Sequence, residues 1–250
     1  MRAMILAAGL GTRLRPLTND RPKALVTIAG RTLLEITLSR LRSFGVREVI
    51  VNTHHYAEMM DDYLKAHDNF GMRIEVSRED ELLDTGGGLK KAAWFFLQEG
   101  ANSHEPFILH NVDVISTIDL ARMLRVHKEK DALATLAVQE RESSRYLLFD
   151  QNSQLCGRQA GRAAQPELAR SAPEAHALAF SGIHILSSRI LAKMAEEGAF
   201  SIITTYLRLA AKGEKIIGFR ADENYWRDLG RPESISQADA DVRNGLYPLS

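Results

Sequence analysis

The segment LAAGLGTRLRPLTNDRPKAL, residues 6–25, places glycines and cations directly after an apolar run. Gly9 and Gly11 allow the backbone to turn sharply and expose N–H groups, as a loop that binds phosphate oxygens requires. Arg13 offers a planar fork for two phosphate oxygens, whereas Lys23 offers a compact point charge near a reacting phosphorus. The segment therefore predicts a binding site for a polyphosphate.

The two common nucleotide-binding motifs do not fit this segment. The dinucleotide fingerprint needs a third glycine where Leu14 stands, and the P-loop needs a Gly-Lys-Ser or Gly-Lys-Thr sequence that is missing here. A nicotinamide dehydrogenase is therefore not expected, although it would show a similar alternation of strands and helices.

The composition is that of an ordinary globular protein. Among 250 residues, 32 Lys and Arg balance 32 Asp and Glu, so no overall charge favours binding to nucleic acid or to an anionic membrane. The N-terminal apolar run is too short for a signal peptide, and no run approaches the roughly 18 apolar residues that span a bilayer. Cys156 has no partner for an intrachain disulfide. We therefore expect a cytoplasmic protein with neither nucleic acid nor membrane as a partner.

Apolar runs and helical spacings alternate along the first half of the chain. Helical patterns occur at residues 33–41, 86–97 and 120–124. The apolar runs predict strands over residues 3–7, 48–52, 73–77, 107–110 and 132–138. This alternation predicts an α/β fold with a parallel-rich sheet flanked by helices.

The second half has a different texture. Residues 157–176 are rich in Ala, Arg, Gln, Gly and Pro without a clear period, which predicts a long surface loop. No hexapeptide repeat is present, so no C-terminal β-helix is expected. Further elements are predicted as strands at 146–149, 178–186 and 215–219, and as helices at 188–196, at 202–211 and after Pro232.

Residues 6–25 resemble the signature LAAGxGTRLxPLTxxxPKxL of the nucleotidyltransferases that make nucleoside-diphosphate sugars, with every fixed position matched. The resemblance implies a Rossmann-like mixed, mostly parallel sheet with a small α+β sugar-binding part. It implies one domain over 1–250, in which 1–140 mainly bind the nucleotide and 141–250 mainly bind the sugar and supply a second metal aspartate. It also implies that Arg13 contacts the departing pyrophosphate and that Lys23 contacts the phosphates of the reacting nucleotides.

Two aspartates extend the resemblance. Asp113, in ILHNVDVIS, ends an apolar run, and Asp228, in YWRDLGRPE, precedes the last predicted helix. An isolated Asp at such a position is typical of a turn or a helix cap. In the family, however, the corresponding aspartates jointly bind a divalent metal ion, usually Mg2+, which prefers hard oxygen ligands. The family usually has a small residue where this chain has Val112, which bears on how closely a substrate can approach the backbone.

The resemblance also assigns residues to the two substrates. The element Thr85-Gly86-Gly87 matches one that lies against the base and ribose, and a glycine run is otherwise a poor helix start. The family's Glu-Lys-Pro element, whose lysine meets the sugar phosphate, is missing, and Arg158 is the nearest cation that could replace it. Trp226 fits either the sugar site or the core. The catalytic candidates are Arg13, Lys23 and Asp113. The nucleotide-binding candidates are Leu6, Ala8, Gly9, Gly11, Thr12, Thr85, Gly86 and Gly87. The sugar-binding candidates are Asn111, Arg158, Ser181, Gly182 and Trp226.

The resemblance therefore implies an enzyme that joins a nucleoside triphosphate and a sugar 1-phosphate to give a nucleoside-diphosphate sugar and pyrophosphate, with Mg2+ as cofactor. The short chain, the LAAG start and the TGGG run are most similar to short bacterial uridylyltransferases of the family, so UTP is the expected triphosphate. Guanylyl transfer to mannose 1-phosphate, thymidylyl or cytidylyl transfer, and a catalytically silent regulatory subunit that binds a sugar nucleotide stay open. The sequence gives no oligomeric state.

Overall fold

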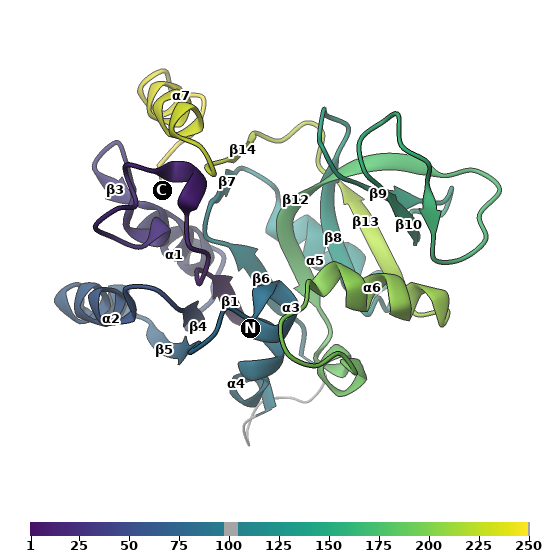
Figure 1. Cartoon of the computed structure of the whole chain (residues 1–250), viewed down its shortest axis with the longest axis horizontal. Helices are drawn as coiled ribbons and strands as arrows, with labels where there is room; N and C mark the ends of the chain where they lie inside the picture. The colour runs from purple at the N-terminus through teal and green to yellow at the C-terminus, as the bar shows by residue number, and fades with distance from the viewer. Residues whose placement is uncertain (98–104, 250) are drawn as a thin grey trace.

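A computed structural model describes residues 1–97 and 105–249 of the chain (Figure 1). Its strands are β1 (Arg2–Leu6), β2 (Thr27–Ile28), β3 (Arg31–Thr32), β4 (Glu48–Thr53), β5 (Arg73–Arg78), β6 (Phe107–Asn111), β7 (Val114–Ser116), β8 (Ala134–Gln139), β9 (Tyr146–Phe149), β10 (Leu155–Gln159), β11 (Glu167–Leu168), β12 (His176–Leu186), β13 (Ile216–Arg220) and β14 (Trp226–Asp228). Its α-helices are α1 (Leu33–Ser43), α2 (Ala57–Ala66), α3 (Asp84–Lys91), α4 (Ala93–Leu97), α5 (Leu120–Glu129), α6 (Ile202–Ala211) and α7 (Pro232–Arg243). Short 3-10 helices are η1 (Thr12–Leu14), η2 (Lys23–Leu25), η3 (Asp68–Gly71) and η4 (Ser188–Lys193).

One ten-stranded sheet runs through the molecule in the order β11-β10-β9-β12-β6-β1-β4-β5, and β8 and β13 extend it from β12. The strands β6, β1, β4 and β5 are parallel to one another. The long strand β12 pairs antiparallel with β6, β8 and β9, so it joins the parallel strands to the later part of the sheet. The predicted α/β fold with a mixed sheet flanked by helices is confirmed, and the described residues contain no β-helix.

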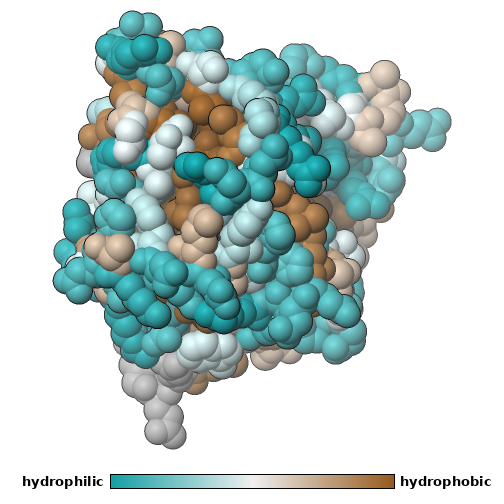
Figure 2. All heavy atoms as spheres, turned by 60° about the vertical axis from the view of Figure 1, so that its left-hand side comes forward, coloured by the Kyte–Doolittle hydropathy of each residue, from teal (hydrophilic) through white to brown (hydrophobic). Residues whose placement is uncertain are grey.

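Helices cover both faces of the sheet. The helices α1, α2, α5 and α7 pack with Ala3 and Ile5 of β1 in one core, whereas α3, α4 and α6 pack with Met4 in the other. Successive residues of a strand point to opposite faces, so a strand buried on both sides is apolar throughout. Figure 1 shows α5 and α6 over the later part of the sheet, and Figure 2 shows a mainly hydrophilic surface with hydrophobic atoms visible between polar side chains.

The predicted loop over 157–176 is wrong in part. β10 extends to Gln159, and β11 pairs with it, with Arg158 opposite Glu167. Gly157 permits this pairing, because a Cβ there would lie 2.4 Å from the carbonyl oxygen of Glu167. Both residues of β11 are exposed, so no alternation of apolar and polar residues marks this strand in the sequence.

Two predicted helices also differ from the structure. The helix expected over 86–97 begins earlier and is divided at Ala92 into α3 and α4. The helix expected over 188–196 is the 3-10 helix η4, because N–H groups such as that of Met194 bond carbonyls three residues back. In the described ranges, no helix is long and apolar enough to cross a membrane.

The parallel strands β1, β4 and β6 end side by side. Leu6 at the end of β1 pairs with both Asn52 of β4 and Asn111 of β6. Ligands of open α/β sheets bind outside the carboxyl ends of the strands. The residues that follow these three strands are therefore where a substrate site is expected.

Candidate active site

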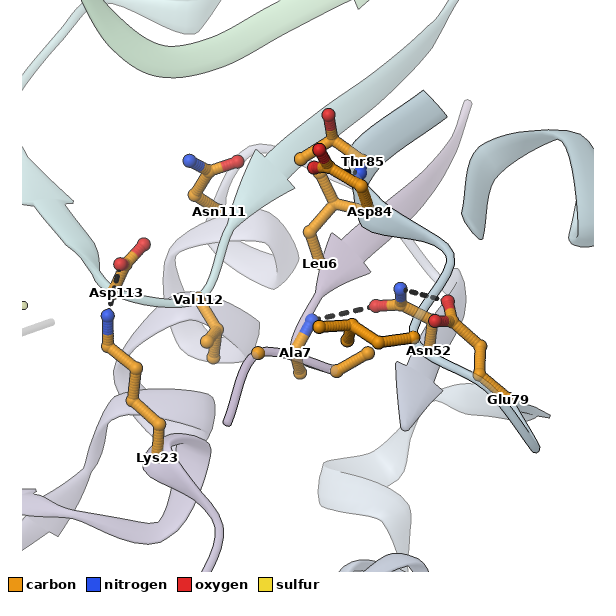
Figure 3. Close-up of a pocket in the computed structure, with 13 residues that line it drawn as sticks. Leu6, Ala7, Lys23, Asn52, Glu79, Asp84, Thr85, Asn111, Val112 and Asp113 are labelled. Atoms are coloured by element: carbon orange, nitrogen blue, oxygen red, sulfur yellow. Dashed lines mark hydrogen bonds and ion pairs between the residues drawn. The ribbon is translucent and has the colours of Figure 1, made fainter. Parts of the chain in front are cut away.

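A cavity of about 300 Å3 opens at the carboxyl ends of β1, β4 and β6 (Figure 3). It is formed by the glycine-rich loop after β1, the segment between β5 and α3, and the segment after β6. Its lining residues are Leu6, Ala7, Ala8, Gly9, Lys23, Asn52, Glu79, Leu82, Asp84, Thr85, Asn111, Val112 and Asp113. The cavity thus brings together residues from the predicted phosphate, base and metal elements.

The glycine-rich loop is shaped for a close approach. Gly11 has φ 63°, and a Cβ there would lie 3.0 Å from the Cγ2 of Thr18 and 3.2 Å from the Cβ of Lys23. The Thr18 hydroxyl donates to the carbonyl oxygen of Gly11 at 2.8 Å, which folds the loop onto itself. Among the described residues, no hydrogen bond is made by the backbone N–H groups of Ala8 and Gly9. These donors are the expected features of a phosphate cradle.

Lys23 lies at the start of η2 and is 8 % exposed. Its Nζ forms an ion pair with Oδ2 of Asp113, which follows β6 (Figure 3). A nearly buried ammonium group needs an anionic partner. The predicted catalytic pair therefore lies together at the cavity wall.

The second predicted metal ligand is held beside the first. β14 pairs antiparallel with β7, with Asp228 opposite Val114, and the N–H of Leu229 donates to the carbonyl oxygen of Asp113 at 2.8 Å. Oδ1 of Asp228 accepts from the N–H of Gly230 at 2.7 Å. The guanidinium group of Arg13 also lies close to Gly230: a Cβ added to Gly230 would be 2.9 Å from Nη2 of Arg13. The pairing of β7 with β14 thus places the backbone of Asp113 next to Leu229, and Asp228 and Arg13 both reach the adjacent Gly230.

These residues fit a divalent ion that is shared with a substrate. Mg2+ is usually held by one or two carboxylates together with substrate phosphates and water. Asp113 and Asp228 supply two such carboxylates. In the described part of the chain, no group of three or more His, Cys, Asp or Glu side chains is placed to hold a metal. The site therefore suits a phosphate-bound ion rather than an ion enclosed by protein ligands alone.

Three polar residues of the cavity were missed in the sequence: Asn52, Glu79 and Asp84. Asn52 is buried at the end of β4, where its Oδ1 accepts from the N–H of Ala7 at 2.7 Å and its Nδ2 donates to Oε1 of Glu79 at 2.7 Å (Figure 3). Oε2 of Glu79 accepts from the N–H of Leu83 at 3.0 Å. This chain of hydrogen bonds ties the glycine-rich loop to the start of α3. A polar residue at the end of a buried strand was the available signal for Asn52.

The predicted base-binding element has a structural role as well. Thr85 lines the cavity, and its Oγ1 accepts from the N–H of Ile202 at the start of α6. Gly86 and Gly87 do not line the cavity; both N–H groups donate to the carbonyl oxygen of Phe200. A Cβ at Gly86 would lie 2.3 Å from the Phe200 ring, and one at Gly87 would lie 2.5 Å from the carbonyl oxygen of Gly198. Residues 198–200 pack so closely against Gly86 and Gly87 that neither position has room for a side chain.

Most of the predicted sugar residues gather beyond Asn111, which lines the cavity. Gly182 has φ 73°, and a Cβ there would lie 3.1 Å from Nδ2 of Asn111. Trp226 donates from Nε1 to the carbonyl oxygen of Ser181 at 2.8 Å. Arg158 is apart from this group. It is exposed on β10, does not line the cavity and pairs with Glu167 at 2.7 Å.

Val112 and His110 flank Asn111 along the chain. Val112 is buried, lines the cavity and donates its N–H to the carbonyl oxygen of Leu6 at 3.1 Å. Nδ1 of His110 bonds the carbonyl oxygen of Asn111 at 2.8 Å. Burial, together with the nearby Arg40 guanidinium group, lowers the pKa of His110 to about 3. His110 is therefore neutral near pH 7 and is not a proton donor for the site.

Comparisons with known proteins agree with this geometry. The chain matches the family described as Nucleotidyl transferase over residues 2–245. It is 36% identical over 247 residues to N-acetylmuramate alpha-1-phosphate uridylyltransferase of Caulobacter vibrioides, with 95% of each chain covered. It is 29% identical over 251 residues to mannose-1-phosphate guanylyltransferase of Mycobacterium tuberculosis, with 98% of this chain and 66% of that protein covered.

Solved structures share the fold. HddC from Yersinia pseudotuberculosis, in a complex with GMP-PN, superposes with a TM-score of 0.75 at 23% identity, covering 96% of this chain and 99% of that one. A putative glucose-1-phosphate thymidylyltransferase from Bacillus anthracis superposes with a TM-score of 0.79 at 18% identity, covering 98% and 96%. At these identities the likeness concerns the fold.

Proposed function

Because the chain belongs to the nucleotidyl transferase family, we propose that it transfers the uridylyl group of UTP to N-acetylmuramate 1-phosphate and releases pyrophosphate. Nucleotidyl transfer follows from the family, whereas the base and the sugar are the proposal. The full-length similarity to the Caulobacter vibrioides uridylyltransferase supports both.

The observation that carries the proposed reaction is the convergence of four charged side chains, of which Lys23 and Asp113 line the cavity, whereas Arg13 and Asp228 lie beside Asp113 without lining it. Lys23 and Asp113 form an ion pair, and Asp228 and Arg13 both approach Gly230 next to them. A silent regulatory subunit would have no need for this set. The convergence therefore supports an active enzyme.

In the proposed reaction, a phosphate oxygen of the sugar 1-phosphate attacks the α-phosphorus of the triphosphate. A new phosphorus–oxygen bond forms, and the bond from the α-phosphorus to the bridging oxygen breaks, so its electron pair leaves with pyrophosphate. The attacking phosphate is already anionic near pH 7, so no strong general base is required. The main task of the protein is to hold two mutually repelling anions in line.

We assign the side chains to this task by position. The N–H groups of Ala8 and Gly9 and the guanidinium group of Arg13 bind the leaving phosphates, and the ammonium group of Lys23 binds the reacting phosphates. Asp113 and Asp228 hold the divalent ion, and we propose Mg2+. When bound, the ion neutralises charge that develops on the phosphate oxygens. Asn52 and Glu79 fix the loop on which the phosphates lie.

The experiment is pyrophosphate release with Mg2+, in which UTP, GTP, dTTP, CTP and ATP are each tested with N-acetylmuramate 1-phosphate, N-acetylglucosamine 1-phosphate, glucose 1-phosphate, mannose 1-phosphate and phosphocholine. We expect the highest kcat/KM with UTP and N-acetylmuramate 1-phosphate. Preferred turnover of GTP with mannose 1-phosphate would replace the proposal by the second candidate, to which the 29% identity over nearly the whole chain points. Release with no pair would refute the proposal.

A further inference from the structure

A half-buried cation, Arg141, lies just after β8 on the sugar side of the site. Its Nη2 donates to the carbonyl oxygen of Phe180 at 2.7 Å, directly before the predicted sugar residues Ser181 and Gly182. Its guanidinium carbon lies 3.6 Å from the centroid of the Trp226 ring. Its Nη1 donates to the carbonyl oxygen of Glu142 at 3.5 Å. Stacking on an aromatic face and bonds to two carbonyl oxygens fix the plane of the fork.

The strand β14 places Arg141 on the same side as the metal aspartate. Trp226 and Asp228 are two residues apart, so their side chains point to the same face of the strand. Arg227 between them points to the other face and pairs with Asp241 of α7. Arg141, which stacks on Trp226, therefore lies on the same side of β14 as the carboxylate of Asp228.

The charge of Arg141 has no partner within the described residues. No carboxylate forms an ion pair with it, and its Nε is buried without a hydrogen-bond acceptor. Burial lowers the pKa of Arg141, and the carboxylate of Asp228 opposes that effect only from a distance. Guanidinium groups nevertheless stay protonated in proteins. A fixed, partly desolvated cation with a free donor is suited to an anionic ligand.

A second polar atom nearby is also unsatisfied. Oδ1 of Asn111 is buried without a hydrogen-bond partner, and the Nδ2 side of the same amide faces Gly182. Buried polar atoms are normally paired, so an unpaired one next to a cavity points to a ligand group. The Ser181–Gly182 segment of β12 therefore has an unpaired acceptor and a cation without a carboxylate partner near it.

We propose that Arg141 binds a carboxylate on the sugar and so selects acidic sugar 1-phosphates over their neutral counterparts. This inference rests on the proposed function, because N-acetylmuramate is N-acetylglucosamine with a lactyl ether that ends in a carboxylate. The phosphate of the acceptor has its own cation in Lys23, together with the ion that Asp113 and Asp228 would hold. Arg141 is a further cation beside these, stacked on Trp226, so it meets the second anion of the substrate.

The test compares two acceptors that differ only in the lactyl group. Wild type, Arg141→Met and Arg141→Lys are assayed with UTP and either N-acetylmuramate 1-phosphate or N-acetylglucosamine 1-phosphate. We expect Arg141→Met to lower kcat/KM for the acidic acceptor by about ten- to a hundredfold, mainly through KM, and to change the neutral acceptor less than about threefold. Arg141→Lys keeps the charge and should retain part of the preference.

Arg145→Met is the matched control, because the side chain of Arg145 is exposed and, among the described residues, only its backbone groups are hydrogen-bonded. An equal loss with both acceptors in Arg141→Met would assign Arg141 to the phosphate or to folding, and no loss would remove it from the site. Either result overturns the inference and leaves the proposed function standing.

Failure of the proposed function looks different. Wild type would then transfer the uridylyl group to neither acceptor. In that case, the binding of each acceptor to wild type and to Arg141→Met, measured by calorimetry, would test the role of Arg141 without any turnover. Tighter binding of the acidic acceptor that is lost in Arg141→Met would support it. Equal binding of both acceptors, or no binding, would overturn it.

Discussion

The ammonium group of Lys23 and the carboxylate of Asp113 form an ion pair beside the cavity, although 90 residues separate them in the sequence. Each group offsets the charge of the other while no substrate is bound. The ammonium group of Lys23 suits a phosphate group, and the carboxylate of Asp113 suits a divalent ion. A substrate phosphate with its divalent ion would therefore supply each side chain with a new partner of opposite charge. The free site is therefore already arranged for a charged substrate.

Removing either member of this pair should abolish most of the turnover. We expect Lys23→Ala and Asp113→Asn each to lower kcat for pyrophosphate release by about a hundredfold or more, because each removes charge stabilisation that the reaction requires. The variants should still fold, as circular dichroism and thermal unfolding would show. Lys91→Ala is the control, since among the residues that the structure describes Lys91 forms an ion pair only with the fully exposed Asp80, at 3.7 Å. Near-native turnover of either variant would contradict the assignment.

The second aspartate should set the requirement for the metal. EDTA should abolish pyrophosphate release, and added Mg2+ should restore it. In Asp228→Asn, we expect half-maximal activity to need about tenfold or more Mg2+, because the ion loses one of two charged ligands. Asp20→Asn should leave the titration unchanged, because Asp20 is exposed and, within the described ranges, forms an ion pair only with its neighbour Arg21. An unchanged Mg2+ titration in Asp228→Asn would show that Asp228 does not bind the ion.

Two glycines should respond to alanine in opposite ways. A Cβ at Gly9 meets no atom within 4 Å, so Gly9→Ala should fold normally but raise the KM for the triphosphate about tenfold, because the methyl group occupies the phosphate cradle. A Cβ at Gly86 would lie 2.3 Å from the Phe200 ring. Gly86→Ala should therefore lose about 1 to 3 kcal/mol of stability, or roughly 3 to 10 °C in Tm. Thermal unfolding and steady-state kinetics of both variants would check this, and equal Tm values would contradict it.

The hydrogen bonds of Glu79 should matter to stability and to nucleotide binding together. Glu79→Ala leaves Nδ2 of Asn52 and the N–H of Leu83 buried without acceptors, each at a cost of about 1 to 3 kcal/mol. Glu79→Gln keeps the shape and one acceptor, so its loss should be smaller. We expect the KM for the triphosphate to rise in both variants, because the Ala7 end of the glycine-rich loop loses its support. Chemical denaturation beside kinetics would test this; a Glu79→Ala protein as stable as wild type would refute it.

The part of the site that depends on contiguous residues was predictable. The glycine-rich loop, Arg13 and Lys23 lie within one segment, and the strand before that segment, β1, is marked by its apolar residues. The contact between Asn52 and Glu79 was not predictable, because it depends on the order β1-β4-β5 in the sheet, which the chain order does not specify. Local patterns indicate the elements, whereas tertiary contacts require the arrangement of those elements.

The same distinction explains the glycines of α3 and the edge strand β11. Gly86 was assigned to the nucleotide because Thr85-Gly86-Gly87 matches the family element that lies against the base and ribose, and the structure shows a close approach of Gly86 to Phe200. Which group approaches is set by the packing of α6 against α3, far apart in the sequence. In β11, Glu167 and Leu168 are both exposed, so pairing with β10 left no apolar pattern.

Two buried histidines should make the protein sensitive to mild acid. Burial lowers the pKa of His110 and of His184 to about 3, from an ordinary value of 6.5. The unfolded chain therefore binds protons below about pH 6.5 that the folded chain does not bind until about pH 3. The stability that neutral histidines preserve is complete above pH 6.5 and is lost as pH falls toward 3, by about 2 kcal/mol for each histidine at pH 5.

This dependence can be assigned to a single residue. The free energy of unfolding of wild type and His184→Asn would be measured by urea denaturation at pH 7.5 and at pH 5.0, an interval in which carboxylates with ordinary pKa values stay mostly ionised. His184 bonds the hydroxyl of Tyr206 at 2.8 Å, so the variant should be less stable at both pH values. Its loss of stability between the two pH values should nevertheless be smaller than that of wild type by about 2 kcal/mol, because one buried titrating group is missing. An equal loss in the two proteins would mean that His184 is protonated in the folded state as readily as in the unfolded chain.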